Sequence, residues 1–358
     1  MLVATASPAR TALKNSQLTC GDSPLYMRRC TISWESMSSL QIVVRWVHFS
    51  VSILLAALFL FELVVVAPFA RKPPETTESL FLSLRQLTRR LAWWTWSIAQ
   101  ISWVAWLWLI TAWMSGEDLI ACINSDALST VLFSTQFGHL WLIRLFIGVV
   151  FGTILYLAKR KFRGRSVLDV SLAWLSCIEL VSLAWAGHAV ADARPYGTLH
   201  LLGDTLHLLT SAFWPGALLP LATFFLLLVK TRQIRDLAWA AVVVRRFSTS
   251  SLIAVAAMAL TGLSNSVFMV GSFHGLLTTD YGHLLLSKLV LFHLMVGFGA
   301  WNLLLLKPRL AVDVPAMNVV DQERTIRSLF RNVLWEIGLG GAVILIVALL
   351  GTTSPPMH

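Results

Sequence analysis

The chain after residue 40 alternates long apolar runs with short polar connections. An α-helix needs about 20 apolar residues to cross the hydrocarbon core of a bilayer, and each run is about that long or longer. The pattern therefore predicts an all-α fold, a polytopic transmembrane helical bundle of about eight spans. The expected spans lie near residues 41–69, 90–114, 137–158, 166–189, 199–229, 247–271, 281–306 and 333–352.

Lys and Arg are concentrated in every second connection. The connections after the first, third, fifth and seventh spans each carry a basic cluster, whereas those between them hold Arg194 alone. Basic connections stay in the cytoplasm, so this alternation predicts a multi-pass protein of the bacterial inner (plasma) membrane with both termini periplasmic. Residues 1–36 are polar and irregular, and we interpret them as a disordered or mis-assigned N-terminal extension.

Composition narrows the function classes. Apolar residues make up 57% of the chain and charged residues 13%, whereas a soluble domain has about 25% charged residues. The net charge of +10 is accounted for by the basic connections, which favours contact with the lipid bilayer and predicts no nucleic-acid partner. No nucleotide-binding loop, nucleophile elbow or zinc-protease motif is present, so we expect no enzyme activity.

The two halves of the chain resemble each other. The motif Thr-x-(Phe/Tyr)-Gly-His-Leu-x-Leu-x-(Arg/Lys)-Leu begins at Thr135 and recurs at Thr279. His48, early in the first span, matches His207, early in the fifth. An offset of four spans keeps the orientation, so the pattern predicts a tandem parallel four-helix repeat with halves at 37–190 and 191–358.

Histidines gather at the predicted periplasmic ends of the spans. His200, Asp204 and His207 are spaced i, i+4 and i+7, which puts them on one helical face. His188 ends the preceding span, across a short connection. Imidazole is the commonest metal ligand, and polar groups inside a membrane usually mark function. These four residues therefore predict a metal site at the periplasmic mouth of the bundle.

Three further histidines are candidate ligands for the same metal. His48 lies in the first span, and the motif places His139 and His283 at the starts of the third and seventh spans. For His139 and His283, a structural role at the start of the helix is an equal alternative.

Two basic residues lie inside predicted spans. Arg144 and Lys288 occupy matching positions of the repeated motif. Each either extends to the membrane surface or neutralises an acid such as Asp204 or Glu179.

One segment resembles a known family. Gly187-His188-Ala189, the run from His200 to Pro220 and the run from Thr279 to Asn302 are together similar to the copper resistance protein D family, most clearly over residues 180–310. The resemblance implies an eight-span protein that transports copper or confers copper resistance. It also implies copper as Cu(I) or Cu(II) on the periplasmic histidines, and a periplasmic partner of the copper resistance protein C type. Pro215 departs from the family pattern and predicts a kink in the fifth span.

Two other functions fit the same residues. Histidines on facing helices can ligate haem, so a b-type haem electron carrier using His48, His139, His207 and His283 is the main alternative. A membrane scaffold or sensor without metal is the second.

Overall fold

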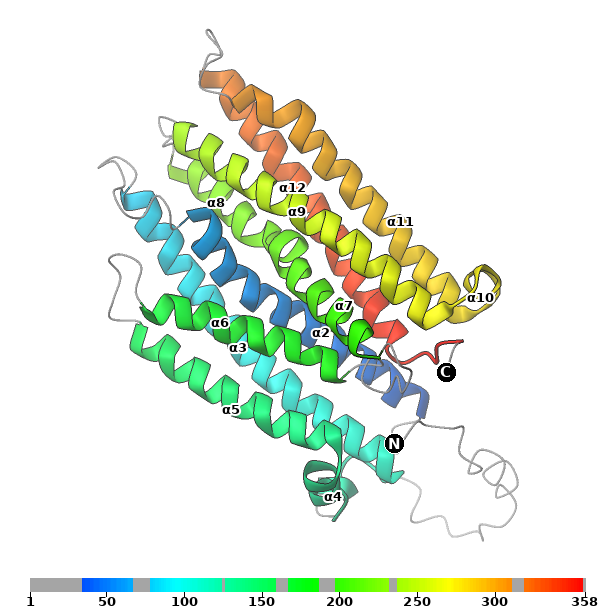
Figure 1. Cartoon of the computed structure of the whole chain (residues 1–358). Helices are drawn as coiled ribbons and strands as arrows, with labels where there is room; N and C mark the ends of the chain where they lie inside the picture. The colour runs from blue at the N-terminus through cyan, green and yellow to red at the C-terminus, as the bar shows by residue number, and fades with distance from the viewer. Residues whose placement is uncertain are drawn as a thin grey trace, which may run out of the picture.

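The computed structural model describes residues 34–66, 78–123, 126–158, 167–186, 197–231, 237–310 and 319–356. These residues form helices and no strand, and eight segments are long and apolar enough to cross a membrane. The predicted transmembrane bundle and its eight spans are therefore confirmed. Figure 1 shows α4, α10 and the C-terminal end of α12 at the same end of the bundle. We call this the histidine end, and the opposite end the basic end.

The first half contains four long helices. They are α2 (Trp34–Leu60), continued by the π-helical segment η1 (Phe61–Val66), then α3 (Glu78–Ser115), α5 (Gln136–Leu157) and α6 (Val167–Val181) with the 3₁₀ segment η4 (Ser182–Ala186). Two short helices, η2 (Ala121–Ile123) and α4 (Asp126–Ser134), precede α5.

The second half contains the other four spans. The fifth span consists of α7 (Gly197–Ser211), the π-helical segment η6 (Ala212–Gly216) and α8 (Leu218–Thr231). The sixth is α9 (Leu237–Val270), followed by the short helix α10 (Phe273–Thr278). The seventh is α11 (Asp280–Trp301) with η8 (Asn302–Leu306) and η9 (Lys307–Leu310), and the eighth is α12 (Val319–Leu350).

Helix α2 joins the two halves. It packs against α3 and α6 of the first half and against η6 and α12 of the second. Gly216 of η6 lies so close to α2 that an added Cβ would be 2.8 Å from Ile53 Cγ2. Pro215, at which the sequence predicts a kink, lies inside the π-helical segment η6, and a proline has no backbone N–H to donate to a regular helix.

Three helices are longer at the basic end than the hydropathy pattern predicted. Helix α3 begins at Glu78 rather than near residue 90, α9 at Leu237 rather than near 247, and α12 at Val319 rather than near 333. The sequence boundary followed the loss of apolar residues. The helices continue past charged residues such as Arg89 and Arg245 because the first of these side chains binds Asp169 and the second reaches solvent, which hydropathy does not measure.

One of these extensions is held by buried ion pairs. Arg85 and Arg89 of α3 both bind Asp169 of α6, and Arg85 Nε lies 2.8 Å from Glu62 Oε1 of η1. The two arginine side chains are 3% and 9% exposed. These basic residues, which we had interpreted as topology signals, therefore also connect three elements of the first half.

Candidate functional site

The repeated motif forms the same corner in both halves. Thr135 and Thr279 cap α5 and α11, and each side chain accepts a hydrogen bond from the backbone N–H of the motif glycine at 3.0 Å. A Cβ on Gly138 would lie 2.1 Å from the Val131 carbonyl oxygen, so this position requires glycine for the short helix α4 to approach α5. The motif therefore encodes a tight turn between a short helix and a long one.

His139 and His283 complete these corners. His139 Nε2 is 3.0 Å from the carbonyl oxygen of Phe133, and His283 Nε2 is 2.8 Å from that of Leu277. Both rings are exposed at the histidine end. The structure thus gives each of them a structural contact, and their role as metal ligands stays a prediction.

His48 lies in a closed polar cluster of the first half. Its side chain is 1% exposed, and its ring stacks on Trp103 with centroids 5.0 Å apart. Ser102 Oγ donates to the Ala99 carbonyl oxygen at 3.0 Å, so it accepts from His48 Nδ1–H at 2.9 Å. That assignment makes Nε2 the hydrogen-bond acceptor of the ring.

Arg144 donates a hydrogen bond to this Nε2 atom of His48. Its Nη2 donates to His48 Nε2 at 3.0 Å, and its Nη1 donates to the Glu179 carbonyl oxygen and to Ser182 Oγ. The guanidinium carbon lies 4.4 Å from the centroid of a Trp103 ring. Of the two roles expected for Arg144, extension to the membrane surface is therefore wrong, because the side chain turns inward beside Glu179.

His207 of the second half has a hydroxyl partner that matches the one of His48. Thr261 Oγ1 donates to the Ala257 carbonyl oxygen at 2.8 Å, so it accepts from His207 Nδ1–H at 3.0 Å. This bond makes Nε2 the unprotonated nitrogen. No hydrogen bond to His207 Nε2 is present within the described part of the chain, so its lone pair is free for a ligand.

The other two predicted ligands of this helix, Asp204 and His200, lie on the same side of α7 as His207, and we call this side the α7 face. Asp204 Oδ1 accepts from Asn265 Nδ2 at 3.2 Å, and the His200 ring stacks on Phe268 with centroids 4.8 Å apart. Together with His207 and Thr261, these contacts form a ladder of three rungs between α7 and α9. Asn265 Oδ1 is buried and has no hydrogen-bond partner among the described residues. A buried acceptor without a donor indicates a place for water or a cation.

Lys288 faces the same ladder from α11. Its ammonium interacts electrostatically with Asp204 and His207, and Asp204 also interacts with His200 and Tyr281. Lys288 thus balances the Asp204 charge, which was one of the two roles that the sequence predicted.

The structure therefore divides the predicted metal ligands. It brings His200, Asp204 and His207 together on α7, it places His48 in a separate cluster with Arg144, and it leaves His139 and His283 at the corners. His188 lies outside the described residues. Within the described ranges, no group of three or more His, Cys, Asp or Glu side chains is arranged to hold a metal ion.

Sequence reasoning missed the hydroxyl partners of the two buried histidines. Ser102 and Thr261 fix the rings of His48 and His207, and each lies 54 positions after its histidine. The shared separation of 54 residues is a signal in the sequence from which the pairs His48–Ser102 and His207–Thr261 could have been found.

Comparison with known proteins gives the family of this chain. Residues 36–198 match the model of the copper resistance protein D-like N-terminal domain, and residues 241–350 match that of copper resistance protein D. The copper resistance protein D of Pseudomonas syringae pv. tomato is 33% identical over 251 residues, which cover 68% of this chain and 77% of that protein. The chain belongs to the copper resistance protein D family.

Two further relatives of the family are more distant. The copper transport protein CutJ of Bacillus subtilis (strain 168) is 31% identical over 226 residues, which are 63% of this chain but only 38% of that protein. The inner membrane protein YebZ of Escherichia coli (strain K12) is 28% identical over 221 residues, 62% of this chain and 70% of that protein. No solved structure matches the chain significantly.

Proposed function

We propose that this chain moves copper across the bacterial inner membrane and thereby contributes to copper resistance, without enzyme activity. Two relatives are named for copper resistance and copper transport, and a third is named as an inner membrane protein. Within this proposal both termini are periplasmic, so the histidine end faces the periplasm and the basic end faces the cytoplasm. Copper would arrive from a periplasmic protein of the copper resistance protein C type.

Copper first binds at the α7 face of the second half. The observation that supports this most directly is His207 Nε2, which has no hydrogen bond from any described residue and whose ring orientation is fixed by Thr261. The carboxylate of Asp204 lies one turn away and offsets the positive charge of Lys288, and the unpaired Asn265 Oδ1 is a further acceptor. Imidazole nitrogen suits copper in either oxidation state.

His200 extends the site toward the periplasm, and we include His188 as a further candidate ligand from the sequence. His200 is buried at the start of α7, one turn beyond Asp204, and His188 precedes α7 in the sequence. They would receive copper before His207 does.

The haem alternative gains no support. A haem ligand needs a free imidazole nitrogen, yet both ring nitrogens of His48 are engaged, Nδ1 by Ser102 and Nε2 by Arg144.

The test is copper handling in cells that carry single substitutions. We expect His207→Ala and His200→Ala to change cellular copper content and copper tolerance to the values of cells without the protein. His293→Ala is the matched control, because this exposed histidine of α11 bonds to the Leu289 carbonyl oxygen of its own helix at 2.7 Å. Unchanged copper content and tolerance with His207→Ala, at equal protein level, would overturn the proposal.

A further inference from the structure

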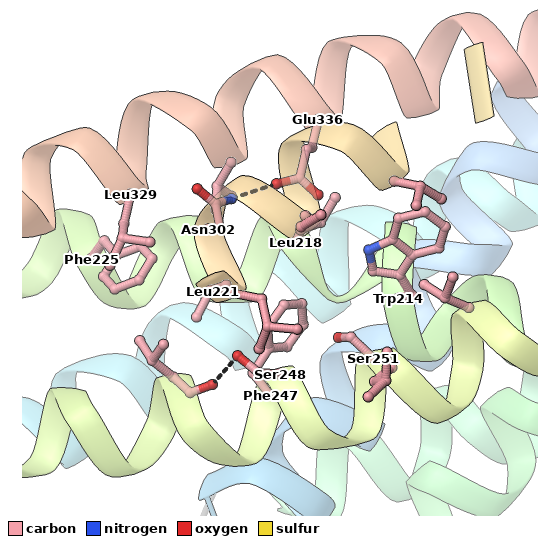
Figure 2. A pocket seen from close by; sticks show the side chains of 18 residues that line it. Trp214, Leu218, Leu221, Phe225, Phe247, Ser248, Ser251, Asn302, Leu329 and Glu336 are labelled. Carbon is pink, nitrogen blue, oxygen red and sulfur yellow. Dashed lines mark hydrogen bonds between the residues drawn. The ribbon is translucent and has the colours of Figure 1, made fainter. Parts of the chain in front are cut away.

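The second half contains a cavity closer to the basic end than the α7 face. It has a volume of about 150 Å³ and lies between η6, α8, α9, α11 and α12. Trp214 lines it and lies seven residues after His207, or ~10 Å along a regular helix. Apolar side chains form most of the wall, and Figure 2 shows Asn302 and Glu336 on one side and Ser248 and Ser251 on the other.

Glu336 is the acid of this cavity. Its side chain is buried, and Oε1 accepts from Asn302 Nδ2 at 2.8 Å (Figure 2). Asn302 Oδ1 in turn accepts from Asn332 Nδ2 at 2.9 Å. Among the described residues, those that line the cavity come from every surrounding helix and include no Lys, Arg or His and no titratable group other than Glu336. An ionised carboxylate without a basic partner is costly at this depth, so the carboxyl needs a cation.

A proton is the cation that fits. Copper prefers imidazole or sulfur ligands, and no His, Cys or Met lines the cavity. A hard metal ion needs several free oxygens, but Asn302 Oδ1 already accepts a hydrogen bond from Asn332. A proton needs one carboxylate oxygen. The cavity also has room for water, and Ser251 Oγ, on the opposite wall, is buried without a hydrogen-bond partner in the described part of the chain.

We propose that Glu336 binds and releases a proton in this cavity, and that copper movement through the second half is coupled to that proton. The coupling rests on the proposed function, whereas proton binding by Glu336 does not. Glu336 lies 13 residues from one end and 14 from the other of the span Glu323–Leu350, so the proton is held about midway through that span. Asn332 extends the polar chain one turn toward the basic end, where the proton would exchange with water.

Proton binding is tested without copper. The full-length protein is reconstituted in lipid vesicles and treated with a hydrophobic carbodiimide, which reacts with protonated carboxyl groups, and modification of each acid is followed by mass spectrometry across a pH series. We expect modification at Glu336 that falls as the pH rises. Absence of modification at Glu336 at every pH, or modification that does not depend on pH, would overturn the proposal.

Coupling is tested in the same vesicles with a trapped pH-sensitive dye and added copper. We expect the wild-type protein to move protons, in either direction, when copper moves, and Glu336→Gln to bind copper normally but to lose the proton flux. Glu323→Gln is the matched control, because this acid of the same helix lies outside the cavity and pairs with Arg327 at 2.5 Å. Equal proton flux with Glu336→Gln and wild type would overturn the coupling. Wild-type protein that moves no copper would instead contradict the proposed function, and the carbodiimide result would still decide proton binding.

Discussion

The two halves of this protein place the same histidine in opposite environments. His48 and His207 each stand on the first helix of their half, and each donates from Nδ1 to a hydroxyl 54 positions later. In the first half, the remaining ring nitrogen accepts from Arg144, whereas in the second half the cation at the matching motif position is Lys288, which interacts with Asp204. His48 therefore has both ring nitrogens bonded, whereas His207 Nε2 has no hydrogen bond from any residue that the structure describes.

The next rung shows the same difference. Asp204 bonds to Asn265 in the second half. Asp204 lies three residues before His207, and Arg45 lies three residues before His48. Asn265 lies four residues after Thr261, and Trp106 lies four residues after Ser102. The guanidinium carbon of Arg45 is 5.1 Å from the centroid of the Trp106 ring. The second half therefore has Asp204 and Asn265 at the positions where the first half has Arg45 and Trp106. Positive charge in the first half repels a metal ion, and a carboxylate in the second attracts one.

The comparison suggests that the halves have different tasks. The first half, with its buried Arg144 cluster and the ion pairs of Arg85 and Arg89, has the contacts of a rigid support. Under the proposed function the second half carries the ions, because it has an imidazole nitrogen without a described partner, a π-helical interruption at Pro215 and a cavity.

The largest effect is expected for removal of the buried arginine. Arg144→Met removes the cation beside the Glu179 carboxylate. It also removes the donor to the Glu179 carbonyl oxygen and to Ser182 Oγ. We therefore expect the substitution to lower the free energy of unfolding by about 3–5 kcal/mol. Lys288→Met removes a half-buried charge and costs less. Thermal unfolding of the purified variants in detergent measures both. Equal losses would contradict the assignment of the first half as the support.

Copper affinity separates the two histidines. We expect His207→Ala to weaken copper binding by more than the ~10–100-fold that is typical for loss of an outer-shell partner, because a ligand itself is removed. His48→Ala leaves copper affinity unchanged, since its Nε2 is occupied by Arg144. Titration of the purified variants with copper is the measurement, and a larger loss with His48→Ala than with His207→Ala would reverse the comparison.

A single substitution can give His207 Nε2 a guanidinium donor like the one that His48 Nε2 has. Lys288→Arg keeps the charge but supplies a planar guanidinium that can donate to His207 Nε2, as Arg144 does to His48. We expect copper affinity to fall by roughly 10-fold or more, because the lone pair becomes occupied. Lys230→Arg, near the end of α8, is the control for an added guanidinium. Copper affinity equal to wild type with Lys288→Arg would show that the identity of this cation does not decide which half is open.

The smallest effect is expected for the hydroxyl partners. Thr261→Val keeps the shape of the side chain but removes the acceptor of His207 Nδ1–H, and we expect copper affinity to fall by about 10-fold. Ser102→Ala is the equivalent change at His48 and leaves copper affinity unchanged. Copper titration compares the two, and equal affinities in both variants would argue against a role for ring orientation.

Much of the fold could be predicted from the sequence. A long run of apolar residues in lipid must make its backbone hydrogen bonds internally, and an α-helix does so. The eight spans could therefore be predicted from hydropathy. The α7 face followed from helical spacing alone, which is why His200, Asp204 and His207 were grouped correctly. The basic ends of α3, α9 and α12 could not be placed this way, because charged residues near these ends are stabilised by solvent or by partners distant in sequence, such as Asp169 for Arg85.

By itself, the sequence determined the helical architecture, the repeated corner motif and the chemical types available at the histidine end. Only the tertiary structure decided which imidazole is free. The motif is nearly the same in both halves, and the outcome depends on whether the cation five residues after its histidine hydrogen-bonds to a buried imidazole, as Arg144 does, or only interacts electrostatically with a carboxylate and an imidazole, as Lys288 does. That choice is made by contacts between helices about a hundred residues apart, for which spacing along one helix gives no information.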